Sequence, residues 1–192
     1  MAAQYYGADA IGFVFWKKSP RFISPGDAGK IIDKLSPFIT TVGVFVDERP
    51  EKINEIIRSA GLGCVQLHGG ESPDDCLKIE SRIIKAVRIK EGADIGKLKG
   101  YSPSAFLLDT YREGVPGGTG ESFNWDIAVL AKEYGRIILS GGLNPENVVS
   151  AISKVRPYGV DVSSGVEARP GRKDPRKISE FIKRVREIEE EI

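Results

Sequence analysis

The sequence predicts an α/β protein of the (β/α)8 TIM-barrel class, with seven of the eight strand–helix units visible in 192 residues. Three observations predict this class. Short apolar runs rich in β-branched residues recur along the chain, most are followed by a helical pattern, and they begin roughly every 20–30 residues, about the length of one βα unit. Strands that are buried on both faces of a parallel sheet have this nearly continuous apolar character.

The expected strands are those apolar runs, which lie at 10–15, 41–46, 64–67, 83–89, 105–109, 136–139 and 158–162. No second domain or linker separates them, so we expect residues 1–192 to form a single β/α-barrel domain. An open dinucleotide-binding sheet would carry G-x-G-x-x-G after its first strand, and the sequence contains no such motif. The barrel is therefore favoured over the open sheet.

The expected helices have clear start signals, in which a capping residue or a proline precedes a helical pattern. These starts are Ser24-Pro25, Pro50, Ser72-Pro73, Asn144-Pro145 and Asp174-Pro175. Segments 94–99 and 125–134 are weaker helical candidates.

The residues before the first expected strand, MAAQYYGAD, have the pattern of a helix that ends at Gly7. A closed barrel of this class needs eight strands. We therefore expect the first strand and most of the first helix to be missing from this chain, because it either starts at an internal methionine or has been shortened.

Composition and charge exclude several classes of protein. Lys plus Arg number 28 against 27 Asp plus Glu, so the formal net charge of +1 indicates neither nucleic acid nor a membrane surface as partner. No apolar run approaches the length of a membrane span, and no signal peptide opens the chain. Cys64 and Cys76 form no disulfide framework, and a single histidine, His68, excludes a histidine-rich metal site. We expect a cytoplasmic protein without a metal.

Two glycine-containing loops predict a phosphate site. Gly141 and Gly142 follow the sixth expected strand and precede a helix, while Ser163, Ser164 and Gly165 follow the seventh. Backbone N–H groups at helix starts and in glycine turns bind phosphate, and barrels often use the loops after their last two strands for this purpose. The alternative is that both loops are tight turns with capping residues, but their shared composition favours phosphate.

Asp109 ends the fifth expected strand, where barrel enzymes place their chemistry. The alternative for this carboxylate is a helix N-cap, but its position before a glycine-rich loop favours catalysis. That loop, 111–120, either folds over a substrate or is an idle flexible segment.

Two other polar side chains follow expected strands. Arg21 lies in a basic loop with Lys17 and Lys18, and the residues alone leave open whether it binds an anion or is a solvated charge. His68 ends the third expected strand, where a structural hydrogen-bond donor is as good an explanation as a group that faces a substrate.

At these residues the chain resembles the phosphoribosylanthranilate isomerases. The matching stretches follow one another in order along the whole chain, and the set is specific although each one alone is weak. They are GADAIGFVF (7–15), KSPRFISP (18–25), VGVFVD (42–47), VQLHG (65–69), LLDT (107–110), LSGGLNPENV (139–148) and VDVSSGVE (160–167), followed by PG (170–171) and KD (173–174).

The resemblance implies an Amadori rearrangement in tryptophan biosynthesis, from N-(5-phosphoribosyl)anthranilate to 1-(o-carboxyphenylamino)-1-deoxyribulose 5-phosphate. It implies that Asp109 is the general acid, that Arg21 binds the anthranilate carboxylate and that His68 faces the same substrate. The reaction includes no redox step or hydrolysis, so no cofactor is expected. The expected partner is a small phosphorylated substrate, and the protein would be a monomer or a homodimer.

The chain departs from this family at the base. The family's base is a cysteine on a first strand that reads like KICGIT, and this chain has no such segment. Cys64 opens the third expected strand and Cys76 lies within an expected helix, so neither replaces it. The alternatives are a catalytically inactive phosphate-binding barrel, an indole-3-glycerol-phosphate synthase or a pentose-phosphate epimerase, and the single histidine argues against the epimerase.

Overall fold

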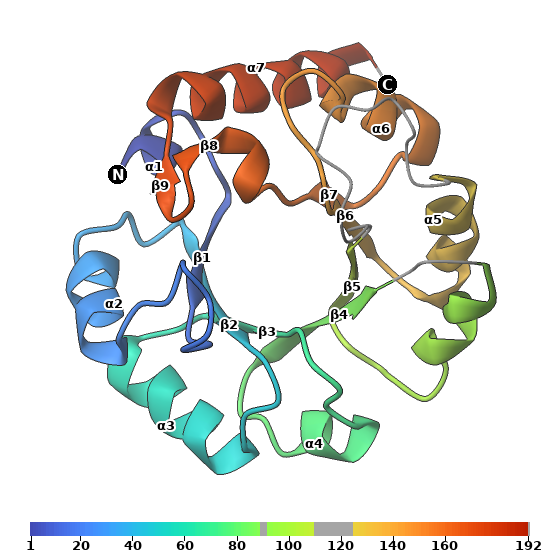
Figure 1. Ribbon diagram of the computed structural model, residues 1–192. Coiled ribbons are helices and arrows are strands. Elements are labelled where there is room, and N and C mark those ends of the chain that lie inside the picture. Colours follow the sequence, from blue (N-terminus) through green and yellow to red (C-terminus); the bar gives the residue numbers. More distant parts are fainter. Residues whose placement is uncertain (89–91, 110–124, 192) are drawn as a thin grey trace. The chain divides into compact units, whose positions relative to one another are not determined.

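The computed structural model describes residues 1–88, 92–109 and 125–191 (Figure 1). The chain divides into two compact units. Unit 1 comprises Met1–Ala86 and Tyr101–Ser104. Unit 2 comprises Val87–Gly100 and Ala105–Ile192. No helix among the described residues is long and apolar enough to span a membrane.

The strands of unit 1 are parallel and pair in the order of the sequence. They are β1 (Ala10–Val14), β2 (Thr40–Phe45), β3 (Cys64–Leu67) and β4 (Arg82–Arg88), the last of which continues into unit 2. The register places Phe45 opposite Leu67, and Leu67 opposite Lys85. The carboxyl ends of these strands therefore meet at one edge of the sheet.

The helices of unit 1 are α1 (Ala2–Tyr5), α2 (Pro25–Ile32), α3 (Pro50–Ala60) and α4 (Pro73–Leu77). Each of the last three begins at a proline, and Ser24 and Ser72 cap α2 and α4 by accepting backbone hydrogen bonds from Asp27 and Asp75. Gly61 closes α3 in the left-handed conformation, with φ of 73°.

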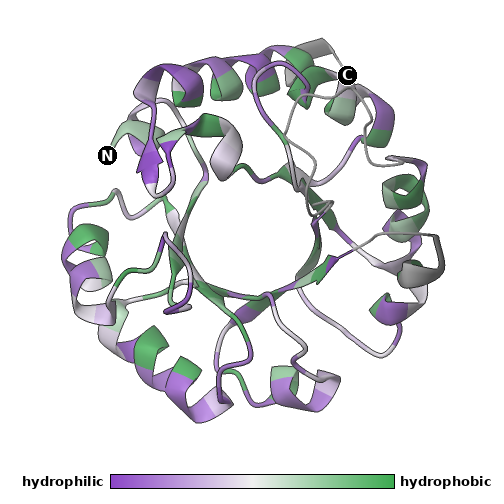
Figure 2. Cartoon of the chain, viewed as in Figure 1, coloured by the Kyte–Doolittle hydropathy of each residue, from purple (hydrophilic) through white to green (hydrophobic). Residues whose placement is uncertain are grey.

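The core of unit 1 lies between the strands and their helices. Hydrophobic residues occupy one side of α3 and hydrophilic residues the other (Figure 2), and the buried side includes Ile53 and Ile56. These side chains cluster with Phe13, Phe45 and Val65 from the strands. Burial of each such side chain contributes about 1.5–3 kcal/mol, so this amphipathic face holds the helix on the sheet.

Unit 2 contains three more parallel strands in sequential order, β5 (Ala105–Asp109), β6 (Ile137–Ser140) and β7 (Gly159–Val160). Its helical segments are α5 (Trp125–Ala131), α6 (Val148–Val155), α7 (Pro175–Glu191) and the 3-10 turns η1 (Gly92–Leu98), η2 (Lys132–Tyr134) and η3 (Ser164–Val166). The buried residues include Phe106, Leu108, Leu139, Val148, Ile152 and Phe181.

The seven expected strands and four of the five expected helix starts are confirmed, with some differences in the extent of the strands. The seventh strand is only the two residues of β7, and segment 94–99 is the 3-10 turn η1. A short antiparallel hairpin, β8 (Glu167–Arg169) and β9 (Arg172–Lys173), was not expected. The helix tail before the first strand is confirmed as α1, followed by Gly7 with φ of 95°.

The start of α6 also differs from the expectation. Asn144 and Asn147 exchange side-chain-to-backbone hydrogen bonds of 2.9 and 3.0 Å, so residues 144–147 form a closed turn and the helix begins at Val148. Gly141 and Gly142 therefore lie farther from the helix N-terminus than the proline signal indicated.

Candidate functional site

His68 lies at the carboxyl end of β3 in unit 1. Its backbone N–H donates to the Phe45 carbonyl at 2.8 Å, and its ring Nδ1 lies 2.9 Å from the Gln66 side-chain nitrogen. Gln66 and His68 are two residues apart on an extended segment, so both side chains leave the same face of the sheet. When the Gln66 amide donates this bond, the neutral ring carries its proton on Nε2.

Arg21 lies in the segment that follows β1, which folds back on the end of that strand. Phe22 forms a parallel bridge with Val14, and the Ile23 N–H donates to the Val14 carbonyl at 3.0 Å. The Arg21 backbone N–H donates to Ser19 Oγ at 3.1 Å, and its side chain is half-buried. Arg21 and His68 thus both follow carboxyl ends of unit 1 strands, whereas Lys17 and Lys18 are exposed.

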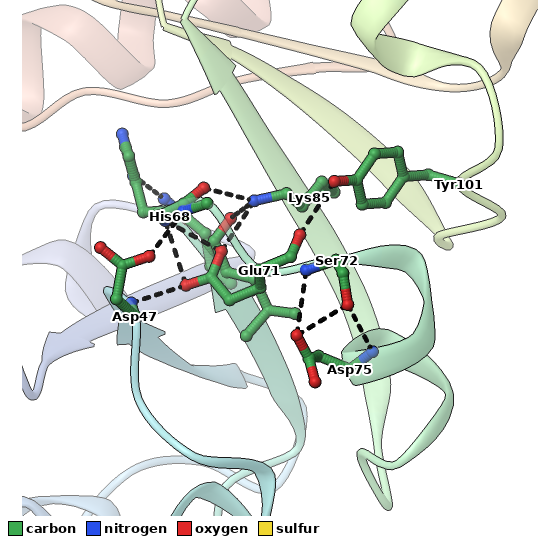
Figure 3. A network of polar contacts seen from close by, with 11 residues as sticks. Asp47, His68, Glu71, Ser72, Asp75, Lys85 and Tyr101 are labelled. Atoms are coloured by element: carbon green, nitrogen blue, oxygen red, sulfur yellow. Dashed lines mark hydrogen bonds and ion pairs between the residues drawn. The ribbon is translucent and has the colours of Figure 1, made fainter.

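A buried ion pair beside His68 was missed by the sequence analysis. Lys85 Nζ lies 2.8 Å from Glu71 Oε2, and each side chain is only 4% exposed. Figure 3 shows Glu71 between Asp47 and Lys85, with Tyr101 beyond the lysine. One signal in the sequence could have revealed it, because Lys85 stands within the apolar run IIKAVRI and a charge in a buried strand requires a partner.

Asp109 is the last residue of β5 in unit 2 and lies opposite Ser140 of β6. Its side chain is 15% exposed, and its Oδ2 lies 4.0 Å from Nε of Arg88, whose own side chain is 69% exposed. Ser140 Oγ donates to Asp161 Oδ2 at 2.8 Å. Two carboxylates thus follow strands of unit 2, and only Asp109 was singled out from the sequence.

The two expected phosphate loops contact each other in unit 2. Gly141 and Gly142 adopt left-handed conformations, with φ of 80° and 72°. A Cβ added at Gly165 would overlap the carbonyl of Leu143, so only glycine allows this approach. The structure therefore brings Gly141 and Gly142 together with the segment that contains Ser163, Ser164 and Gly165.

Lys173 adds a cation to this pair of loops. Its Nζ donates to the Ser163 carbonyl at 2.8 Å and to Glu167 Oε1 at 3.2 Å, and it lies 3.4 Å from Ser163 Oγ. The hairpin β8–β9 carries both Glu167 and Lys173, and this unexpected element is what places the ammonium group beside Ser163.

Both cysteines have the positions expected from the sequence. Cys64 opens β3 and Cys76 lies in α4, so neither follows a carboxyl end of a strand. Burial raises the pKa of the Cys64 thiol and that of the Cys76 thiol, which leaves little thiolate at neutral pH. Neither group is suited to remove a proton from a substrate.

The expected site residues fall into two sets. Arg21 and His68 belong to unit 1, and Asp109 with the phosphate loops belongs to unit 2. The loop 111–120, expected to fold over a substrate or to be idle, lies outside the described residues. Within the described ranges, no group of three or more His, Cys, Asp or Glu side chains could hold a metal ion.

Comparison with known proteins gives a consistent result. A family model described as N-(5'-phosphoribosyl)anthranilate (PRA) isomerase matches residues 2–184. The N-(5'-phosphoribosyl)anthranilate isomerase of Trichlorobacter lovleyi is 54% identical over 182 residues, which is 94% of this chain and 89% of that protein. The corresponding protein of Citrifermentans bemidjiense is 50% identical over 182 residues, 95% of this chain and 88% of the relative.

Solved structures agree with the sequence relatives. The crystal structure of phosphoribosyl anthranilate isomerase from Thermotoga maritima superimposes with a TM-score of 0.90 at 46% identity, covering 97% of this chain and 92% of that one. A phosphoribosyl anthranilate isomerase in complex with reduced 1-(o-carboxyphenylamino)-1-deoxyribulose 5-phosphate gives a TM-score of 0.86 at 44% identity, covering 97% and 91%.

Proposed function

The chain belongs to the N-(5'-phosphoribosyl)anthranilate isomerase family of tryptophan biosynthesis and has its β/α-barrel fold, and we propose that Asp109 is its general acid. The observation that carries this assignment is the place of Asp109 at the carboxyl end of β5, where barrel enzymes hold their reactive groups. Its carboxyl group is largely buried and lies beside Arg88.

The proposed role is to open the sugar ring. Asp109 gives a proton to the furanose ring oxygen, the bond from this oxygen to C1 breaks, and the electrons of the anthranilate nitrogen form a Schiff base with C1. The carboxylate that remains is stabilised by the Arg88 guanidinium. Removal of the C2 proton then gives an enolamine, which tautomerises to the ketone. We assign no residue of this chain to that second proton transfer, because neither thiol lies at the carboxyl end of a strand.

We further propose that Gly141, Gly142, Ser163, Ser164 and Gly165 bind the 5-phosphate group. The support is the contact between the two loops and the left-handed conformation of Gly141 and Gly142. Turns of this kind can leave successive backbone N–H groups available to bind an anion. The ligand bound by the solved relative carries a phosphate of this kind. Lys173 holds Ser163 in place and adds a positive charge nearby.

Arg21 is proposed to bind the anthranilate carboxylate, with His68 facing the same ligand. The planar guanidinium forms two parallel hydrogen bonds with a carboxylate, a geometry that lysine lacks. Both side chains follow carboxyl ends of unit 1 strands.

The experiment that tests the assignment of Asp109 compares Asp109→Asn with Asp126→Asn, a change at an exposed surface carboxylate. Measured in chains that carry a base for the C2 proton, Asp109→Asn should abolish turnover and Asp126→Asn should not. Calorimetry should give unchanged affinity for the reduced product analogue in both variants. Retention of most of kcat by Asp109→Asn would refute the assignment. Phosphate binding without turnover in the wild-type chain would favour the alternative of an inactive phosphate-binding barrel.

We also propose a single cooperative domain that forms a homodimer in the cytoplasm. The support for a dimer is that the Thermotoga maritima relative is dimeric. Phe38, which is 93% exposed in unit 1 of this chain, is a position at which a dimer can be tested. Sedimentation of the wild type and of Phe38→Glu tests the dimer, and a single unfolding transition observed by circular dichroism tests the single domain. Two separate unfolding transitions would contradict the proposal of a single domain.

A further inference from the structure

The Glu71 carboxylate joins the segments that follow β2 and β3. Its Oε1 accepts the backbone N–H of Asp47 at 2.9 Å, and both oxygens accept the backbone N–H of Gly69, at 3.1 and 3.0 Å (Figure 3). Asp47 lies two residues after Phe45, the last residue of β2, and Gly69 directly follows His68. One buried carboxylate thus fixes two strand ends at once.

Lys85 completes this arrangement from β4. Its Nζ donates to the Leu67 carbonyl at 3.3 Å and to the Gly69 carbonyl at 2.8 Å, in addition to Glu71. The ammonium group also lies 5.9 Å from the centre of the Tyr101 ring, and the Tyr101 hydroxyl donates to the Glu71 carbonyl at 2.9 Å. The residues on both sides of His68, Leu67 and Gly69, are therefore held by the same ammonium group.

The backbone around the pair is interlocked. Asp47 is one of the few non-glycine residues in the left-handed region, with φ of 50°, and its Oδ1 accepts the Gly70 N–H at 2.6 Å. A Cβ at Gly69 would overlap Asp47. Such strained and tightly fitted conformations persist only where the surroundings over-determine them, and they concentrate at functional sites.

Stability alone does not account for a pair of this kind. Well-packed apolar residues of similar volume can replace a buried ion pair with little or no loss of stability. Apolar residues cannot accept the N–H groups of Asp47 and Gly69 or donate to the carbonyls of Leu67 and Gly69. Only the charged pair supplies the hydrogen-bond acceptors and donors that fix the two strand ends.

We propose that Glu71 and Lys85 are positioning residues that hold the segments after β2 and β3 so that His68 faces the anthranilate portion of the ligand. The proposal rests on the proposed function for the identity of that ligand. Neither residue touches the ligand, and both act through the backbone on either side of His68. The phosphate loops belong to unit 2 and have no part in this role.

The test is the double variant Glu71→Leu/Lys85→Met, which replaces the pair with apolar residues of similar size. We expect it to fold but to melt below the wild type, because the N–H groups of Asp47 and Gly69 lose their acceptor. We expect it to bind the reduced product analogue about tenfold more weakly, with unchanged affinity for inorganic phosphate. The matched control is Arg58→Met/Glu80→Leu, which removes an ion pair of the same unit whose side chains are both 63% exposed. It should bind both probes as the wild type does.

Amide hydrogen exchange gives a second result that requires no ligand. The N–H groups of His68 and Gly70 bond to Phe45 and Asp47, not to the ion pair itself. Their exchange should accelerate at least tenfold in the double variant, while that of Gly63 at the opposite end of β3 stays unchanged. Wild-type exchange at His68 and Gly70, or equal affinity for the analogue in both proteins, would overturn the proposal.

The outcomes separate the two proposals. If the wild-type chain fails to bind the analogue, the proposed function fails. Amide hydrogen exchange alone then decides whether the ion pair holds the segments after β2 and β3. If the double variant does not fold, Glu71→Gln is measured in its place, because an amide nitrogen in the place of Oε2 cannot accept from the Gly69 N–H or from Lys85 Nζ. Weaker analogue binding with unchanged phosphate binding then supports the proposal, and wild-type binding of both probes refutes it.

Discussion

Replacing Lys85 alone with methionine would leave the Glu71 carboxylate buried without its cation. In the wild type the lysine nitrogen makes contacts of 2.8, 2.8 and 3.3 Å, and both side chains are 4% exposed. Removal of one partner from a buried ion pair costs about 3–5 kcal/mol, because the remaining charge is desolvated and uncompensated. That is a large share of the roughly 5–15 kcal/mol by which a domain is stable.

The surface pair Arg58–Glu80 gives the matched comparison. Its nitrogen–oxygen distance of 2.7 Å is shorter than that of the buried pair, yet both side chains are 63% exposed. Exposed pairs contribute roughly 0–1 kcal/mol, so Arg58→Met should cost at most about 1 kcal/mol. We therefore expect the larger loss of stability for Lys85→Met, because burial and not distance determines the cost of removing one partner.

Urea unfolding followed by circular dichroism measures both variants under the same conditions. We expect Lys85→Met to lower the free energy of unfolding by about 3–5 kcal/mol. Glu71→Leu/Lys85→Met should recover only part of that loss, because the N–H groups of Asp47 and Gly69 then lack their acceptor. Equal, small losses of unfolding free energy in Lys85→Met and Arg58→Met would show that the Glu71 carboxylate is not desolvated.

Three further predictions concern the ligand loops and the thiols. Arg21→Lys should weaken binding of the product analogue but not of inorganic phosphate, and equal losses for both probes would exclude Arg21 as the carboxylate ligand. Gly165→Ala should cost about 1–3 kcal/mol of stability and lower phosphate affinity, because the added methyl group overlaps the Leu143 backbone. Gly26→Ala is the control in both measurements, because a Cβ at Gly26 has no neighbouring atom within 4 Å. Because burial raises the pKa of the Cys64 and Cys76 thiols above 9.0, their protonated forms favour the native state. This contribution should be lost as the pH rises above about 9, and alkylation at pH 8 should be slow until urea is added; rapid alkylation of the native chain would contradict it.

Local signals in the sequence were sufficient for most of the elements. Ser24-Pro25 and Ser72-Pro73 specify helix starts because the serine hydroxyl accepts an N–H that the helix itself leaves unpaired, and this interaction spans only three residues. The resemblance to the isomerase family predicted Asp109 and Arg21 as candidate site residues in the same way, from short motifs. The fold class and the family therefore followed from the sequence.

The contacts that shape the candidate site depend instead on residues far apart in the chain. Glu71 meets Asp47 across 24 positions and Lys85 across 14, and no periodicity links them. Similarly, Gly165 has to be glycine because the Leu143 carbonyl lies against it. Pro170-Gly171 is a turn signal, but it does not show that the hairpin around it places Lys173 beside Ser163. The sequence by itself determined which elements form and which family they belong to, since capping and apolar periodicity act within a few residues. Only the tertiary structure decided which charges are buried together, because desolvation and pairing depend on neighbours that chain folding brings into contact.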